Sequence, residues 1–168
     1  MEHREQVRRA EARIVDDLTR CEDSIAELYK TYGQMMPHMN DFWARLSEGE
    51  EARARLLTAV RRLLDKGHLF YNIGKFNSAG IQSLYGYVNH VLAAAKKATP
   101  SDAHAVCAAL SIQVALAEVH FCNVFHSDVP PLKYIAGALS KNIQSQKGAI
   151  ESRMEAIRSS GASSFSFS

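Results

Sequence analysis

The chain has 168 residues, of which 46% are hydrophobic and 23% charged, values typical of one folded domain with a sizeable core. Its net charge is only +2, and its 20 basic residues are interleaved with 18 acidic ones, which argues against a nucleic-acid-binding protein. No segment approaches the ~20 apolar residues of a membrane span. The N-terminal segment lacks the apolar core of a signal peptide, and the cysteines lack C-x-x-C spacing, so we expect a cytoplasmic protein without a zinc site or disulfides.

Hydrophobic residues recur at helical spacing along most of the chain, and no segment alternates like a β-strand. The first helix is predicted over about residues 5–36 and the second over about 39–66. Arg53 is the one charged residue in the apolar stripe of the second helix, which consists of Phe42, Leu46, Gly49, Arg53, Leu56, Val60 and Leu63.

Prolines and small polar residues separate the remaining predicted helices. A short helix is expected from about Ser78 to Lys97. Ser101 is a candidate N-cap for the next helix, which is predicted to run to about His126. The last helix is predicted to start after Pro131, with Ser127 or Asp128 as its cap.

These elements predict an all-α fold, in which two long antiparallel helix pairs are joined by a long connection that contains the short helix. A simple up-and-down bundle with an extra helix packed outside is the alternative. The bundle is expected to cover residues 1–158. Residues 159–168 are rich in serine and phenylalanine and form a predicted flexible tail.

Three segments carry motifs in a distinctive order. The first begins at Glu22, which lies seven residues before Tyr29. A short turn and the aromatic pair Phe42-Trp43 follow, and the segment ends with Glu50-x-x-Arg53 and two leucines. The second is FNSAGIQSLYGYVNHVLAAAKK, and the third is ALSIQVALAEVHFCNVFHSDVPPLKYIAGALSKNIQSQ. Over about residues 22–157 the chain thus resembles the rubrerythrin branch of the ferritin-like superfamily. The resemblance implies a ferritin-like four-helix bundle with a long crossover containing a short helix.

The resemblance also implies a site for two iron or manganese ions, held by carboxylates and histidines from all four long helices. Two of the family's glutamate positions are retained as Glu22 and Glu50, but the histidine position holds Arg53. The other positions hold residues that bind cations poorly or not at all: Gln113, Ile143 and Gln146. We therefore expect a degenerate site with no complete metal centre, no cofactor and no catalytic residue.

Two environments are open for Arg53. In one, its guanidinium occupies the former metal position in a buried polar network that consists of Glu22, Glu50, Arg53, Gln113 and Gln146. In the other, the stem of the side chain packs in the core and the charged head reaches solvent.

A metal-binding alternative is also open, because His120 lies on the inward face of its predicted helix. A single iron or manganese ion would then be held by Glu22, Glu50, Glu118 and His120. A lone inward histidine is more often a hydrogen-bonded core residue.

Two classes of function follow. The first is a non-catalytic ferritin-like module with a structural, assembly or protein-interaction role, expected to form a homodimer. The second is a divergent di-iron or mononuclear metal-binding oxidoreductase or a metal-storage protein.

In the tail, Phe165 and Phe167 alternate with serines and are candidates for docking to a partner protein; the simpler alternative is a disordered end.

Overall fold

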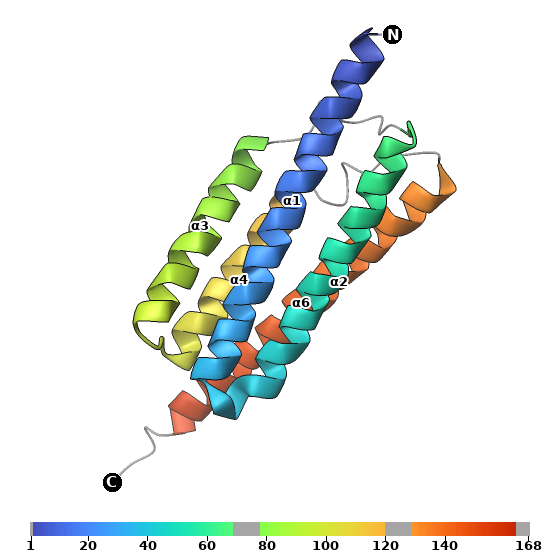
Figure 1. Cartoon of the computed structure of the whole chain (residues 1–168). Helices are drawn as coiled ribbons and strands as arrows, with labels where there is room; N and C mark the ends of the chain where they lie inside the picture. Colours follow the sequence, from blue (N-terminus) through green and yellow to red (C-terminus); the bar gives the residue numbers. More distant parts are fainter. Residues whose placement is uncertain (1, 69–77, 120–128, 164–168) are drawn as a thin grey trace.

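The computed structural model describes residues 2–68, 78–119 and 129–163, and within these ranges the protein is helical and contains no strand (Figure 1). The expectation of an all-α fold is therefore confirmed. The described helices are α1 (Glu2–Met35), the short 3-10 turn η1 (Pro37–Met39), α2 (Asn40–Asp65), α3 (Ser78–Lys97), α4 (Asp102–Glu118) and α6 (Pro130–Ser163).

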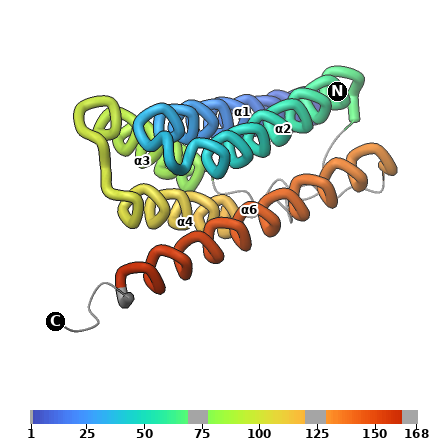
Figure 2. The backbone as a smooth tube through the Cα atoms, turned by 90° about the horizontal axis from the view of Figure 1, so that it is seen from below, coloured from blue at the N-terminus to red at the C-terminus, as the bar shows by residue number. Residues whose placement is uncertain are grey.

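The helices form two layers, with α3, α1 and α2 side by side in one and α4 and α6 in the other (Figure 2). Helix α1 packs on α2 and α3, α4 packs on α6, and the layers are joined by contacts of α2 with α6 and of α3 with α4. Helices α2 and α4 run in the same direction, because α3 traverses the length of the bundle in the opposite direction between them (Figure 1).

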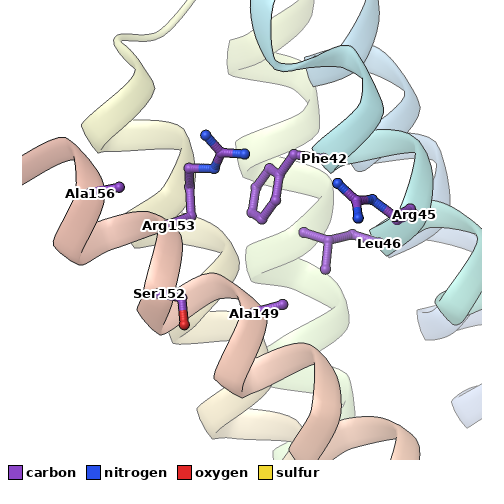
Figure 3. Close-up of a pocket in the computed structure, with 7 residues that line it drawn as sticks. All are labelled: Phe42, Arg45, Leu46, Ala149, Ser152, Arg153 and Ala156. Carbon is purple, nitrogen blue, oxygen red and sulfur yellow. The ribbon is translucent and has the colours of Figure 1, made fainter.

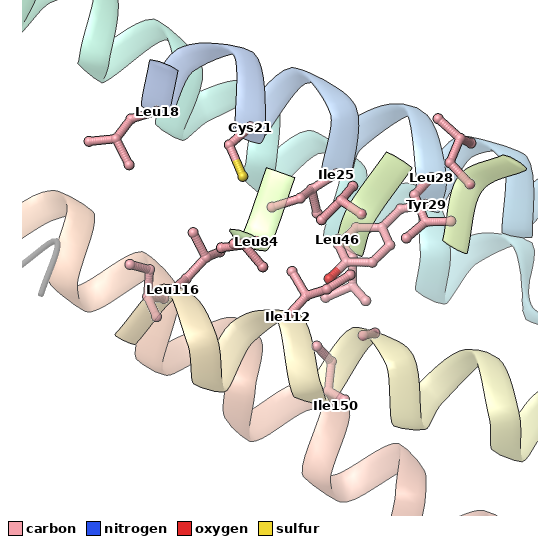
Figure 4. Close-up of a cluster of buried hydrophobic side chains, with 14 of the residues drawn as sticks. Leu18, Cys21, Ile25, Leu28, Tyr29, Leu46, Leu84, Ile112, Leu116 and Ile150 are labelled. Atoms are coloured by element: carbon pink, nitrogen blue, oxygen red, sulfur yellow. The ribbon is translucent and has the colours of Figure 1, made fainter. Parts of the chain in front are cut away.

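The core lies between the two layers (Figure 4). It includes apolar side chains from all five long helices in the described part of the chain, for example Leu18, Leu46, Leu84, Ile112 and Ile150. Helix α3 buries only apolar residues, at the i, i+3, i+4 spacing of one helix face: Ile81, Leu84, Val88, Leu92 and Ala95. The polar residues of the interior therefore come from the other four helices.

The sharp turn between α1 and α2 is fixed by aromatic packing. Pro37 follows α1 and begins the 3-10 turn. The indole ring of Trp43 is fully buried, and its centroid lies 4.8 Å from the ring centroids of both Tyr32 and Phe42. Gly33 leaves room for the first turn of α2, because a Cβ there would lie only 3.0 Å from Oδ1 of Asn40.

The inward face of α2 differs from the predicted stripe toward the end of the helix. Leu57 and Leu64 are fully buried, whereas the predicted Leu56 and Leu63 are only partly buried. The predicted stripe had an average spacing of 3.5 residues, and a straight α-helix has 3.6 residues per turn, so the buried face drifts by about 20° per heptad. Arg53 lies early enough in the helix to remain on the inward face.

Helix ends were predicted with mixed success. Ser101 caps α4 as expected, because its hydroxyl accepts a hydrogen bond from the His104 amide at 3.2 Å. The fourth predicted helix was too long, since α4 ends at Glu118, and residues 120–128 lie outside the described part of the chain.

The last helix is longer than predicted at both ends. Helix α6 begins at Pro130, where a missing amide hydrogen costs no helical bond. It continues to Ser163, into the segment predicted as a tail. None of the described helices is both long and apolar enough to cross a membrane.

Candidate functional site

A buried polar cluster lies at the centre of the four helices α1, α2, α4 and α6. Helix α1 contributes Glu22, α2 contributes Glu50 and Arg53, α4 contributes Gln113, and α6 contributes Asn142. The first four side chains are fully buried and Asn142 is half-buried. Each helix thus directs one or two polar groups to one point of an otherwise apolar interior.

The guanidinium of Arg53 is the centre of this cluster. Its Nε donates to both carboxylate oxygens of Glu22 at 3.1 Å, and one terminal nitrogen lies 3.1 Å from Glu22 Oε2 and also donates to Glu50 Oε2. The other terminal nitrogen donates to Asn142 Oδ1 at 2.7 Å. All three nitrogens therefore have acceptors, which a buried guanidinium needs because it is cut off from water.

A second set of hydrogen bonds connects this centre to α4. The side-chain amide nitrogen of Gln113 donates to Glu50 Oε1 at 2.8 Å and to the Tyr29 hydroxyl oxygen at 3.2 Å. Glu50 therefore accepts hydrogen bonds on both oxygens, one from α2 and one from α4. Tyr29 lies two turns after Glu22 on α1 and is fully buried.

The structure brings Glu22, Glu50, Arg53 and Gln113 together, but Gln146 has a different partner from the one expected. Its side-chain nitrogen donates to the backbone oxygen of Leu46 at 3.0 Å. Asn142, one turn earlier on α6, contacts Arg53 instead. The prediction that Gln113 belongs to the buried network is therefore confirmed, because it binds Glu50, whereas the same prediction for Gln146 is wrong.

The contact of Gln146 with α2 depends on Gly49. A Cβ at position 49 would overlap with the side-chain nitrogen of Gln146. The absence of a side chain at Gly49 thus lets α6 approach α2 closely beside the cluster. This explains why a glycine occupies the middle of an apolar helix stripe, where it otherwise weakens the helix by roughly 0.5–1 kcal/mol.

Burial and charge set the protonation of the cluster. Burial raises the pKa of the Glu50 carboxyl well above its usual range; Arg53 opposes this, whereas the charge of Glu22 and a hydrogen bond with it add to the rise. Burial alone would lower the pKa of Arg53, but Glu22 and Glu50 more than offset it and the pKa is raised. The cluster therefore holds its guanidinium in the charged form and favours retention of a proton by Glu50.

Comparison with protein-family models, with curated proteins and with solved structures finds no match for this chain. The resemblance to rubrerythrin-type proteins thus stays an expectation from the sequence. The chemistry of the site must be judged on its own residues.

The residues of the cluster do not fit a resident iron or manganese ion. Between the carboxylates of Glu22 and Glu50, where a metal would bind, lies the positively charged guanidinium of Arg53. A cation placed there would compete with it for the same oxygens. Among the described residues, no group of three or more histidine, cysteine, aspartate or glutamate side chains is arranged to hold a metal ion.

The alternative single-metal set is not assembled within the described residues. Glu118 lies at the end of α4 and is exposed, whereas Glu22 and Glu50 are fully buried. His120 lies outside the described residues, as do Phe165 and Phe167, the predicted docking residues of the tail.

Two members of the cluster were missed in the sequence, and both carried a signal. Asn142 lies four residues before Gln146, so both point to the same side of α6. Tyr29 lies seven residues after Glu22 and therefore also faces inward. A search for polar residues one or two turns from the predicted ligand positions would have found them.

Replacing Arg53 by methionine tests the cluster directly. Arg53→Met leaves buried carboxyl groups without their cation, so we expect the free energy of unfolding to fall by about 3–5 kcal/mol. Denaturant unfolding monitored by circular dichroism measures this. Arg55→Met is the matched control, because Arg55 is exposed on the same helix, and its effect should stay within about 0.5 kcal/mol.

A second substitution separates loss of the cation from loss of packing. Adding Glu22→Gln to Arg53→Met removes the unpaired carboxylate and should recover part of the lost stability. Equal stability of Arg53→Met and the wild type would mean that the arginine head contributes nothing in the core.

The raised pKa of Glu50 predicts a pH dependence of stability. The unfolded chain releases this proton near about pH 4.3, whereas the folded chain retains it to higher pH. The contribution of Glu50 is therefore complete below about pH 4.3 and declines as the pH rises toward the folded-state pKa, by at most about 1.4 kcal/mol per pH unit.

The difference in unfolding free energy between the wild type and Glu50→Gln, measured between about pH 5 and pH 7.5, should therefore fall as the pH rises. Glu51→Gln is the control, because Lys30 lowers the pKa of Glu51 and its contribution is lost only on acidification. A pH-independent difference for Glu50→Gln would show that Glu50 does not retain its proton.

Proposed function

We propose that this protein is a non-catalytic ferritin-like module with a structural, assembly or protein-interaction role, in which a fixed arginine replaces the metal centre. The observation that carries this proposal is the position of the Arg53 guanidinium between the carboxylates of Glu22 and Glu50. A covalently attached cation satisfies the inward carboxylates permanently and cannot change its oxidation state.

The course of the helices supports the ferritin-like part of this proposal. Helices α2 and α4 run in the same direction, with α3 running back between them, as expected for a bundle with one long crossover (Figure 1). The polar cluster draws residues from α1, α2, α4 and α6 and none from α3. This is the division between four bundle helices and one crossover helix that the plan implies.

Closure of the site supports a non-catalytic role. Glu22, Glu50, Arg53 and Gln113 are all fully buried, and the oxygens of both carboxylates accept hydrogen bonds from within the protein. A substrate would have to displace these bonds to reach the cluster. The arrangement is suited to fixing the relative positions of four helices.

The surface of α4 supports an interaction role that includes homodimer formation. Its charged residues, Asp102 and Glu118, lie at its two ends. Between them, Cys107 and Val114 are exposed, whereas the outward faces of α1 and α2 are rich in charge. A helix face without charges is suited to contact with another protein, because interface cores are depleted in charged residues.

Metal content is the decisive test of this proposal. Protein purified without chelators should contain no stoichiometric iron or manganese by elemental analysis, and the same preparation should sediment as a dimer. About two metal ions per chain would instead support the alternative, a metal-binding oxidoreductase or metal-storage protein.

Arg53→His provides the matched variant for this experiment. It removes the internal cation and restores Glu-x-x-His spacing with Glu50, so this variant should gain metal affinity over the wild type. Arg53→Gln removes the cation without adding a good ligand, so this variant should not gain metal affinity. Equal metal binding by both variants would contradict the proposed link between Arg53 and the former metal site.

A further inference from the structure

A surface groove lies between the start of α2 and the second half of α6, away from the Arg53 cluster (Figure 3). Its volume is about 360 Å³, at the lower end of the range for small-molecule sites. The ring of Phe42 and the side chain of Leu46 form its apolar floor, and Ala149 and Ala156 line it from α6.

Two guanidinium groups flank this apolar floor, one from each helix (Figure 3). The Arg153 guanidinium carbon lies 5.0 Å from the centroid of the Phe42 ring. Arg45 donates from Nε to the backbone oxygen of Asp41 at 3.2 Å. Neither guanidinium forms an ion pair with a described residue. Other arginines of the described residues do form ion pairs: Arg8, Arg9, Arg20, Arg53 and Arg61.

We propose that this groove binds a small amphipathic carboxylate, with its aliphatic or aromatic body on Phe42 and Leu46 and its carboxylate between Arg45 and Arg153. Guanidinium groups without an ion-pair partner are suited to a carboxylate, and the apolar lining, to which Ala149 and Ala156 also contribute, is suited to the remainder of the ligand. Ala149 and Ala156 are two helical turns apart, about 10 Å. A ligand of that length, such as decanoate, spans the groove.

The size of the groove favours a small ligand over a partner helix. One turn of α2 and two turns of α6 line it. A helix-binding surface offers several turns of continuous apolar contact. The site shares no residue with the Arg53 cluster, so this inference does not depend on the proposed function.

Trp43 provides a built-in reporter for the groove. It is the only tryptophan of the chain, is fully buried, and its ring centroid lies 4.8 Å from that of Phe42. A ligand that contacts Phe42 should alter the Trp43 environment. Titration with decanoate below its micelle concentration should therefore give a saturable change in tryptophan fluorescence, with unchanged helicity by circular dichroism.

Two separate changes test the role of charge: one alters the head group of the ligand, and the other alters the arginines of the groove. Decyltrimethylammonium has the same apolar body with the opposite charge and should give no saturable change. Arg45→Gln and Arg153→Gln should each weaken decanoate binding by roughly threefold to tenfold, and the double variant should weaken it further. Arg153→Lys retains the charge and should bind more tightly than Arg153→Gln.

Arg13→Gln is the matched control, because Arg13 is exposed on α1 and does not line the groove. Its affinity for decanoate should equal that of the wild type. The inference is overturned by an equal response to both head groups, by wild-type affinity in the double variant, or by the absence of a saturable change. Loss of helicity at the same decanoate concentrations would also overturn it, since the signal would then report unfolding.

Discussion

The full burial of one guanidinium is the constraint on which the centre of this bundle depends. An arginine head without partners in an apolar interior is too costly to tolerate. Arg53 is compensated by acceptors from three helices, namely Glu22 on α1, Glu50 on α2 and Asn142 on α6, and Gln113 adds α4 through Glu50. A shift of any of these helices by one turn would leave a buried polar group unpaired. The cluster therefore favours one register of the four helices, although such networks need not add stability over an apolar core.

The surrounding structure is arranged to accommodate this cluster. Gly49 lets α6 come close enough to α2 for Gln146 to bind the Leu46 backbone, and Asn142 on the same face of α6 then reaches Arg53. The apolar core encloses the cluster, and this burial raises the pKa of Glu50. Helix packing and charge compensation at the centre of the bundle are thus linked to one buried cation.

Much of this arrangement could be predicted from local patterns. Helical periodicity predicted the long helices, and Arg53 within an apolar stripe, three residues after Glu50, indicated a buried arginine–carboxylate pair. The four-residue spacing of Asn142 and Gln146 places both on one face of α6, but which of them contacts Arg53 could not be predicted, because this depends on the rotation of α6 and on its distance from α2. The end of α4 was missed because apolar residues continue after Glu118, so periodicity gave no stop signal.

The central claim is that the guanidinium of Arg53 is held rigidly and away from water. Hydrogen exchange at the Nε–H group of Arg53 tests this most directly. In protein labelled with ¹⁵N-arginine, the Nε–H resonance of Arg53 is assigned by its absence in Arg53→Met. The account predicts that this hydrogen exchanges with D₂O far more slowly than that of the exposed Arg55, and that the terminal nitrogens give separate resonances because their rotation is restricted. Exchange as fast as at Arg55, with averaged terminal resonances, would place the charged head in water and contradict the account.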